Sequence, residues 1–245
     1  MNVESIPRDA AGLAHVVGLS GGKDSTAMAL ELRRRHPDID FTYFITPTGD
    51  ELPEMVAHWL RLETLLGKPM VRVTNGTLDG WIKHFGALPN FRMRWCTRLL
   101  KIEPCIAWMA RQQPAVLYVG LRADEEEREG IYGSVTCRFP FREWGWGIAE
   151  VRGCLRDFGV EIPERTDCAR CYHQRLGEWK RLAIKYPSIY AAAEKQEAAT
   201  GATFRSPGRD TWPAGLKELR EAFESGRKVR GEDKAGEGPC RVCSL

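Results

Sequence analysis

Long apolar runs are missing from this sequence of 245 residues. One of its most apolar stretches, 115–121, is far shorter than the roughly 20 residues that a helix needs to cross a bilayer. Residues 1–10 contain no apolar segment of the kind that a secretory signal peptide requires. We therefore expect a soluble, cytoplasmic protein with no membrane partner.

An excess of charge of one sign is also missing. Lys and Arg total 36 against 33 Asp and Glu, which gives a formal net charge of +3. So small a bias is compatible with an anionic substrate but does not by itself indicate nucleic acid. Internal repeats and low-complexity tracts are absent, and 43% of the residues are hydrophobic, which suffices for one ordinary core with a small appendage.

Cysteine, in contrast, is plentiful, with eight residues. A disulfide framework is not expected in the reducing cytoplasm. Two CxxC pairs, Cys168/Cys171 and Cys240/Cys243, lie in loop-like sequence, where metal or redox chemistry is the better explanation. The other interpretation, buried thiols, suits the cysteines with apolar neighbours, which are Cys105, Cys137 and Cys154.

Strand-like and helix-like segments alternate through the first part of the chain. The apolar patterns predict strands at 16–19, 39–45, 70–73 and 115–121, and helices at 26–35, 53–66 and 96–111, the last kinked by Pro104. This alternation predicts an α/β fold, a parallel twisted sheet with helices on both faces. Beyond about residue 139 the pattern becomes mostly helical and includes the first CxxC pair.

The clearest candidate site is a glycine turn between a strand and a helix. Ser20-Gly21-Gly22-Lys23-Asp24-Ser25 follows the first predicted strand. Its glycines let the backbone approach a phosphate, the helix start adds positive charge, and the lysine and serines add donors. A plain turn before a surface helix would explain the glycines but not the packed polar residues. The Walker A pattern is absent, because Val17 and Asp24 occupy two of its key positions.

Several further segments carry a family resemblance. Residues 17–25 resemble the PP-loop of the ATP pyrophosphatase superfamily. Within it, the chain is similar to the phosphoadenosine phosphosulfate reductase-like family over about 14–175. The segments that resemble this family are Thr48-Gly49-Asp50-Glu51, Gly120-Leu121-Arg122-Ala123-Asp124-Glu125 followed by Arg128, and Phe139-Pro140-Phe141 with Trp144.

The resemblance implies an adenine nucleotide alpha-hydrolase-like fold in three parts. These are a PP-loop nucleotide-binding domain at 1–145, a helical region with a CxxC at 146–226, and a flexible, Cys-bearing tail at 227–245. It places the nucleotide on Ser20, Gly21, Gly22, Lys23, Asp24, Ser25, Thr48, Gly49 and Gly120. Lys23, Asp24, Arg122 and Arg128 would act at the reacting phosphate or sulfate, although a solvated loop is the alternative for 124–128.

In iron–sulfur members of this family, a Cys-Cys pair on a helix joins a distant CxxC around a [4Fe–4S] cluster. This chain resembles them with Cys96, next to Trp95 in place of the other cysteine, and with Cys168 and Cys171. Three thiolates at matching places indicate a soft-metal site. The fourth ligand would be Cys240 or Cys243 from the tail, or one iron would stay open. Zinc in a closed structural site is the alternative.

Three functions are compatible with these features. The first is ATP-pyrophosphatase-type activation, with Mg²⁺ accompanying ATP, followed by iron–sulfur-assisted sulfur transfer to a nucleobase or nucleic acid. A thiol or sulfur donor such as a desulfurase or thioredoxin would be its partner, and Arg92, Arg94 and Arg98, interleaved with Phe91 and Trp95, would guide a polyanion.

The second function is reduction of phosphoadenosine phosphosulfate or adenosine phosphosulfate to sulfite. Such reductases attack sulfur with a cysteine in a C-terminal Glu-Cys-Gly-Leu-His motif. The tail of this chain, residues 238–245, contains Cys243 as a candidate but lacks that motif. The third function is a non-catalytic subunit that senses nucleotide or redox state. We expect the first, with the other two as alternatives.

Overall fold

The computed structural model describes residues 5–125 and 132–230. A five-stranded sheet in the order β3-β2-β1-β4-β5 forms its centre, and every neighbouring pair of strands is parallel. The strands are β1 (Ala14–Gly18), β2 (Thr42–Ile45), β3 (Val71–Arg72), β4 (Ala115–Tyr118) and β5 (Cys137–Arg138). The predicted α/β fold with a parallel sheet is confirmed.

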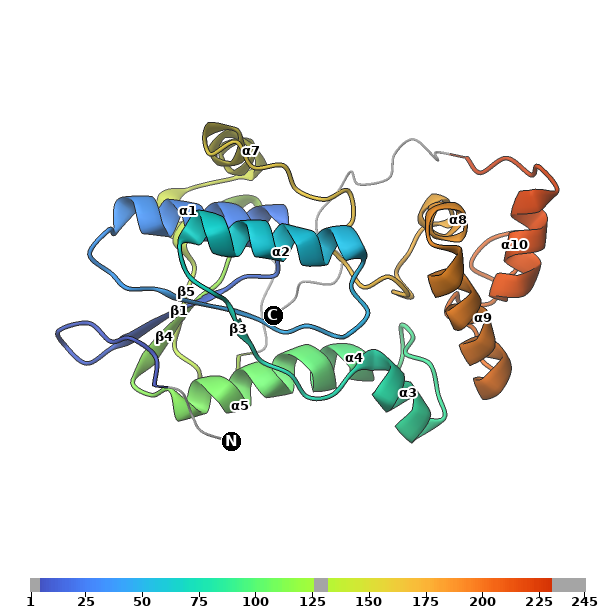
Figure 1. Cartoon of the computed structure of the whole chain (residues 1–245), viewed down its shortest axis with the longest axis horizontal. Coiled ribbons are helices and arrows are strands. Elements are labelled where there is room, and N and C mark those ends of the chain that lie inside the picture. The colour runs from blue at the N-terminus through green and yellow to red at the C-terminus, as the bar shows by residue number, and fades with distance from the viewer. Residues whose placement is uncertain (1–4, 126–131, 231–245) are drawn as a thin grey trace.

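Alternation of side chains along the strands creates two apolar layers. Val17 and Tyr118 face one side, where they pack with α1 (Lys23–Arg35), α2 (Pro53–Leu66) and α7 (Ile148–Asp157). Val16 and Leu117 face the other side, against α5 (Glu103–Arg111). Strands buried on both faces are apolar throughout, as β1 and β4 are. Figure 1 shows α1, α2 and α7 above the sheet and α5 below it.

A second core joins helices from both halves of the chain. Leu78 and Ile82 of α3 (Leu78–Phe85) pack in one buried cluster with Trp179 and Leu219. This cluster sits at one end of the sheet domain, where Figure 1 shows the last three helices. They are α8 (Leu176–Lys185), α9 (Pro187–Thr200) and α10 (Leu216–Glu224). The C-terminal helices therefore share a core with residues 78–100.

The helix expected at 96–111 is divided into three pieces. α4 (Trp95–Thr97) continues into a π-helical turn, Arg98–Ile102, and then into α5. Pro104 stands in the first turn of α5, where its missing N–H costs least. The π-helical turn ends just before the proline, so the segment stays helical as far as Arg111, and such turns are frequent at functional sites.

The remaining described helices are short. α6 (Pro140–Trp144) precedes α7, and a 3₁₀ turn, Ala123–Glu125, follows β4. Within the described ranges, no helix combines the length and apolarity that a bilayer crossing requires.

Candidate functional site

The phosphate loop, Ser20–Ser25, lies at the carboxyl edge of the sheet. β1 ends at Gly18 and α1 begins at Lys23, with Gly22 at the N-cap position. Because Gly22 has no side chain, no N-cap group bonds to the first N–H groups of α1. Anions bind at helix starts of this kind, since the N–H groups and the helix dipole both favour negative charge. The geometry therefore suits a phosphate.

A left-handed turn at Gly21 lets the phosphate loop pass close to α2. Gly21 has a φ of +83°, and a Cβ there would lie 2.2 Å from Met55 Cε and 2.8 Å from Trp59 Nε1. Trp59 Nε1 donates a hydrogen bond of 3.0 Å to the Ser20 carbonyl. The hydroxyls of Ser20 and Ser25 are 3.0 Å apart. Position 21 therefore requires glycine both for its backbone angle and for space.

A cavity of about 50 Å³ opens beside the phosphate loop. Ser20, Thr46 at the end of β2, and Trp59 form part of its wall. The other part comes from Lys101 and from the segment 166–168, which arrives from the C-terminal half of the chain. This cavity lies at the carboxyl ends of β1 and β2, the edge where open α/β sheets bind ligands.

Arg122, expected at the reacting end of the substrate, is buried among carboxylates. Its guanidinium lies 2.8 Å from Asp24 Oδ1, 2.8 Å from Asp124 Oδ1 and 3.4 Å from Glu125 Oε1. The loop after β4 and the phosphate loop also approach closely at Gly120, where a Cβ would lie 3.3 Å from the Asp24 carbonyl. Arg122 thus ties the loop after β4 to the phosphate loop. Its contact with a substrate stays a prediction.

The segment Thr48–Glu51 turns toward the CxxC. Thr48 Oγ1 lies 3.3 Å from Cys168 Sγ. The Glu51 carboxylate accepts hydrogen bonds from the N–H groups of Thr48, at 2.6 Å, and Gly49, at 3.0 Å. Gly49 has a φ of +73° and packs against Thr77. Contacts of Thr48 and Gly49 with a nucleotide stay predictions, because the contacts seen run to Cys168 and Glu51.

A buried ion pair that the sequence did not reveal holds the CxxC in place. Asp50 Oδ1 accepts from Arg170 Nε at 2.6 Å, and Asp50 Oδ2 accepts from the Arg170 N–H at 2.8 Å. The Asp50 carbonyl accepts from the Ala169 N–H at 2.6 Å. Both charged residues are only 5% exposed. Since 120 residues separate Asp50 from Arg170, no local pattern could have paired them.

The three described candidate metal ligands meet at one small cavity. Cys96 from α4, and Cys168 and Cys171 from the CxxC, line this cysteine cavity, which holds about 20 Å³. Burial raises the pKa of Cys168 to about 12 and also raises the pKa of Cys96 and of Cys171. Metal binding must therefore displace protons from these thiols. Trp95, beside Cys96, is buried in the helical core.

Lys101 connects the cysteine cavity with the phosphate-loop cavity. It lines both, as does Cys168. Its positive charge lowers the pKa of Cys96, Cys168 and Cys171, in opposition to the larger effect of burial. Lys101 lies in the π-helical turn, which the sequence pattern did not predict. The only sequence feature that could have indicated this role of Lys101 was its position five residues after Cys96.

The described side chains do not form a coordination site for a single metal ion. No three His, Cys, Asp or Glu residues within 5–125 and 132–230 are arranged to hold a single metal ion. Arg128, Cys240 and Cys243, predicted for the substrate, the metal and sulfur transfer, lie outside the described residues, as does most of the predicted tail. The basic residues Arg92, Arg94 and Arg98 are exposed near the cysteine cavity, which Pro89 lines.

Two solved structures share the architecture of this chain only loosely. Phosphoadenylyl-sulfate (PAPS) reductase from Candida auris, in a phosphate complex, is 14% identical with a TM-score of 0.46, over 66% of this chain and 78% of that one. The U34-tRNA thiolase NcsA from Methanococcus maripaludis, with its [4Fe–4S] cluster, is 15% identical with a TM-score of 0.48, over 95% and 80%.

Such distant likenesses carry no argument about function, and no curated protein sequence matches the chain. The family is decided by sequence. The profile of the phosphoadenosine phosphosulfate reductase domain matches residues 14–136, half of the chain, from β1 to the segment before β5. The chain therefore belongs to the phosphoadenosine phosphosulfate reductase domain family.

Proposed function

We propose that this protein activates an acceptor oxygen with ATP and then replaces that oxygen with sulfur, the acceptor being a nucleobase or a nucleic acid. The observation that supports this proposal is the shared wall of the two cavities, formed by Lys101 and Cys168. A nucleotide bound with its phosphates on Ser20–Ser25 would lie beside the cavity that contains three thiols. One centre would then serve both adenylation and sulfur chemistry.

The proposed reaction has two balanced steps. First, an acceptor carbonyl oxygen attacks the α-phosphorus of ATP, and pyrophosphate leaves with its Mg²⁺. Second, sulfur at the sulfide level attacks the acceptor carbon, the C–O bond breaks, and AMP carries the oxygen away. No net oxidation occurs when the donor supplies hydrosulfide. A persulfide from a desulfurase would require two electrons, which a thioredoxin-type dithiol supplies.

Residues of the phosphate loop would hold and neutralise the departing pyrophosphate. The N–H groups at the start of α1 and the Lys23 ammonium would bind its oxygens. Asp24 would not act as a free carboxylate at the departing pyrophosphate, because Arg122 forms an ion pair with it. Lys101 would favour the thiolate form of sulfur near the α-phosphate, since a nearby cation lowers a thiol's pKa.

We expect an iron–sulfur cluster at these cysteines, with a single zinc ion as the alternative. A [4Fe–4S] cluster binds each thiolate to a different iron, so its cysteines stand farther apart than those around one ion. Cys96, Cys168 and Cys171 line one cavity, which supports a common site for the three thiols. When bound, the cluster would supply an iron that holds sulfur. Cys240 would be the fourth ligand; alternatively, the fourth iron would have no protein ligand. Cys243 would carry sulfur.

The family profile favours one alternative, reduction of a sulfonucleotide. Phosphoadenosine phosphosulfate or adenosine phosphosulfate would bind on the same loop. Attack of a cysteine thiolate, with Cys243 as the candidate, on the sulfonate sulfur would release the adenine nucleotide. A dithiol donor would then release sulfite. A subunit that senses nucleotide or redox state without turnover is the second alternative.

Three assays on anaerobically prepared protein separate these functions. We expect pyrophosphate release from ATP that depends on a nucleobase or nucleic-acid acceptor, and its loss in Lys23→Ala. Sulfite formation from a sulfonucleotide without ATP turnover would replace the proposal with the reductase. ATP binding with neither reaction would indicate a sensing subunit. Iron and sulfide analysis of the same preparation tests the cluster, and stoichiometric zinc without iron would contradict it.

A further inference from the structure

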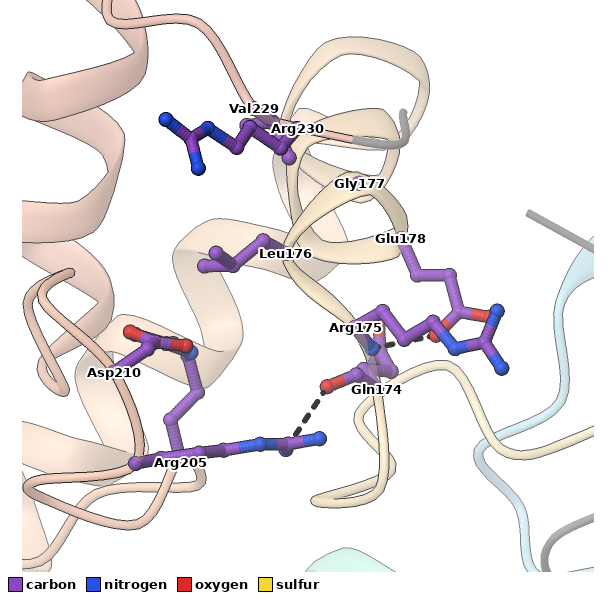
Figure 2. Close-up of a pocket in the computed structure, with 10 residues that line it drawn as sticks. Gln174, Arg175, Leu176, Gly177, Glu178, Arg205, Asp210, Val229 and Arg230 are labelled. Carbon is purple, nitrogen blue, oxygen red and sulfur yellow. Dashed lines mark hydrogen bonds and ion pairs between the residues drawn. The ribbon is translucent and has the colours of Figure 1, made fainter. Parts of the chain in front are cut away.

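A second cavity, of about 260 Å³, lies in the helical region and is lined by arginines. Four of them, Arg175, Arg205, Arg209 and Arg230, form this arginine pocket together with two acids, Glu178 and Asp210. In Figure 2 the pocket surrounds Leu176, with Arg230 on one side of it and Arg205 and Asp210 on the other. Neither the nucleotide nor the metal proposed above uses these residues.

The arginine pocket has an excess of positive charge, with four arginines against two acids, and both acids already accept hydrogen bonds. Asp210 accepts two hydrogen bonds from the buried Arg205, at 3.0 and 2.9 Å. Glu178 Oε2 accepts from the Arg175 N–H at 2.6 Å. Arg209 and Arg230 form no ion pair within 5–125 and 132–230, and both are exposed. They are therefore available to a ligand's negative charge.

The arginine pocket is a built feature and not a chance group of surface charges. Two of its polar side chains, Arg205 and Gln174, are at most 2% exposed. Arg227 anchors the segment that carries Arg230, since its guanidinium lies 4.1 Å from the Trp212 ring centroid and donates to the Thr211 carbonyl at 3.2 Å. The first turn of α8 also lines the pocket, and helix starts favour anions.

Arg209 links the arginine pocket to an exposed aromatic ring beside the cysteine cavity. Its guanidinium lies 5.7 Å from the Phe91 ring centroid and donates to the Gln174 carbonyl at 3.3 Å. Phe91 is 45% exposed, and its ring meets those of Tyr172 and His173 edge-on at 5.1 and 4.6 Å. Tyr172 lines the cysteine cavity. A chain of contacts thus runs from the pocket to the thiols.

We infer that the arginine pocket and Phe91 together bind a single-stranded nucleic-acid acceptor. A base stacks on the open part of the Phe91 ring, and the adjoining phosphates enter the pocket toward Arg209 and Arg230. Alternating aromatic and arginine contacts match the base–phosphate repeat of a strand, which a mononucleotide does not need. Arg92 and Arg94, which are exposed and follow Phe91 closely in sequence, would add positive charge for the strand. This inference rests on the proposed function, of which it specifies the acceptor class.

Equilibrium binding tests the inference without requiring turnover. The probe is a fluorescein-labelled single strand of about 16 nucleotides, as DNA and as RNA, followed by anisotropy over a series of salt concentrations. We expect Arg209→Ala with Arg230→Ala to weaken binding at least about tenfold and to lower the slope of log Kd against log salt by about 0.7 per arginine. Phe91→Ala should weaken binding with the slope unchanged. Lys217→Ala, an exposed charge on α10 outside the pocket, should change little.

Each outcome separates this inference from the proposed function. Strand binding that is unchanged in the double arginine variant and in Phe91→Ala, or that is blocked equally well by inorganic phosphate at low concentration, would overturn the nucleic-acid assignment. Acceptor-dependent pyrophosphate release with a free nucleobase, but no strand binding, would also overturn it while the proposed function stands. If the nucleic-acid strand binds with the expected pattern but no ATP turnover occurs, the binding site is supported and the proposed function is contradicted.

Discussion

The phosphate loop and the cysteine cavity share a wall, yet they are constructed in different ways. The loop is one continuous segment, and its shape follows from the strand, the glycines and the helix around it. The cysteine cavity is assembled mainly from Thr48, from residues 96–101 of α4 and the π-helical turn, and from residues 168–172 around the CxxC. Local sequence therefore determines the first site, whereas the second exists only while three distant segments stay together.

The largest effect expected from this comparison is on metal content. Cys168→Ser should abolish iron and sulfide binding, because it removes one of only three described thiols at the cavity. Cys154→Ser should leave the iron content unchanged, since Cys154 on α7 packs against α1 in the sheet core. Iron and sulfide analysis of anaerobically purified variants measures both. Equal iron content in the two variants would show that Cys168 is not a cluster ligand.

The next effect is on the link between segments. Asp50→Asn should lower the free energy of unfolding by about 3 kcal/mol, because it leaves the buried Arg170 charge with only the exposed Asp79 as a carboxylate partner. Denaturant unfolding followed by circular dichroism measures the loss. As a matched control, Glu103→Gln breaks the exposed pair with Arg98 and should cost about 0–1 kcal/mol. Similar losses in the two variants would show that the buried pair does not hold the CxxC.

A smaller effect should appear within the phosphate loop. Gly21→Ala should destabilise the fold by about 2–4 kcal/mol, from the left-handed backbone and from overlap with Met55 and Trp59. Gly12→Ala is matched in φ, at +79°, but has open space around it, so it should cost only about 1–2 kcal/mol. ATP affinity, measured by calorimetry, should fall in the first variant alone. A normal affinity in Gly21→Ala would contradict the loop geometry.

The smallest effect concerns pH. His58 on α2 is 1% exposed, and burial lowers its pKa to about 4. The unfolded chain takes up this proton below about pH 6.5, whereas the folded protein resists it until about pH 4. Stability is therefore full above pH 6.5 and falls as the pH drops toward 4, by about 1–2 kcal/mol at pH 5.

Unfolding midpoints at pH 7 and pH 5 measure this dependence. His58→Gln should reduce the difference between the two midpoints, whereas His36→Gln, at an exposed position, should preserve it. An unaltered difference in His58→Gln would assign the acid sensitivity to other groups.

Local patterns sufficed for much of the sheet domain. Apolar runs bounded by turn residues located β1, β2 and β4, and amphipathic spacing located α2 at Pro53–Leu66. The π-helical turn was missed, because a proline inside a helical pattern indicates a kink without specifying how the backbone absorbs it. The packing of α3 with α8–α10 was missed as well, since no periodicity reports which helices share a core.

The sequence by itself determined the phosphate loop, since glycine angles, helix polarity and donor placement act over neighbouring residues. It also determined the family, through motifs that a profile recognises. Only the tertiary structure decided that Asp50 pairs with Arg170, that Arg122 is enclosed by carboxylates and that Lys101 borders both cavities. These contacts depend on burial and on chain crossings between distant segments, where desolvation makes each charge seek a partner that sequence spacing does not encode.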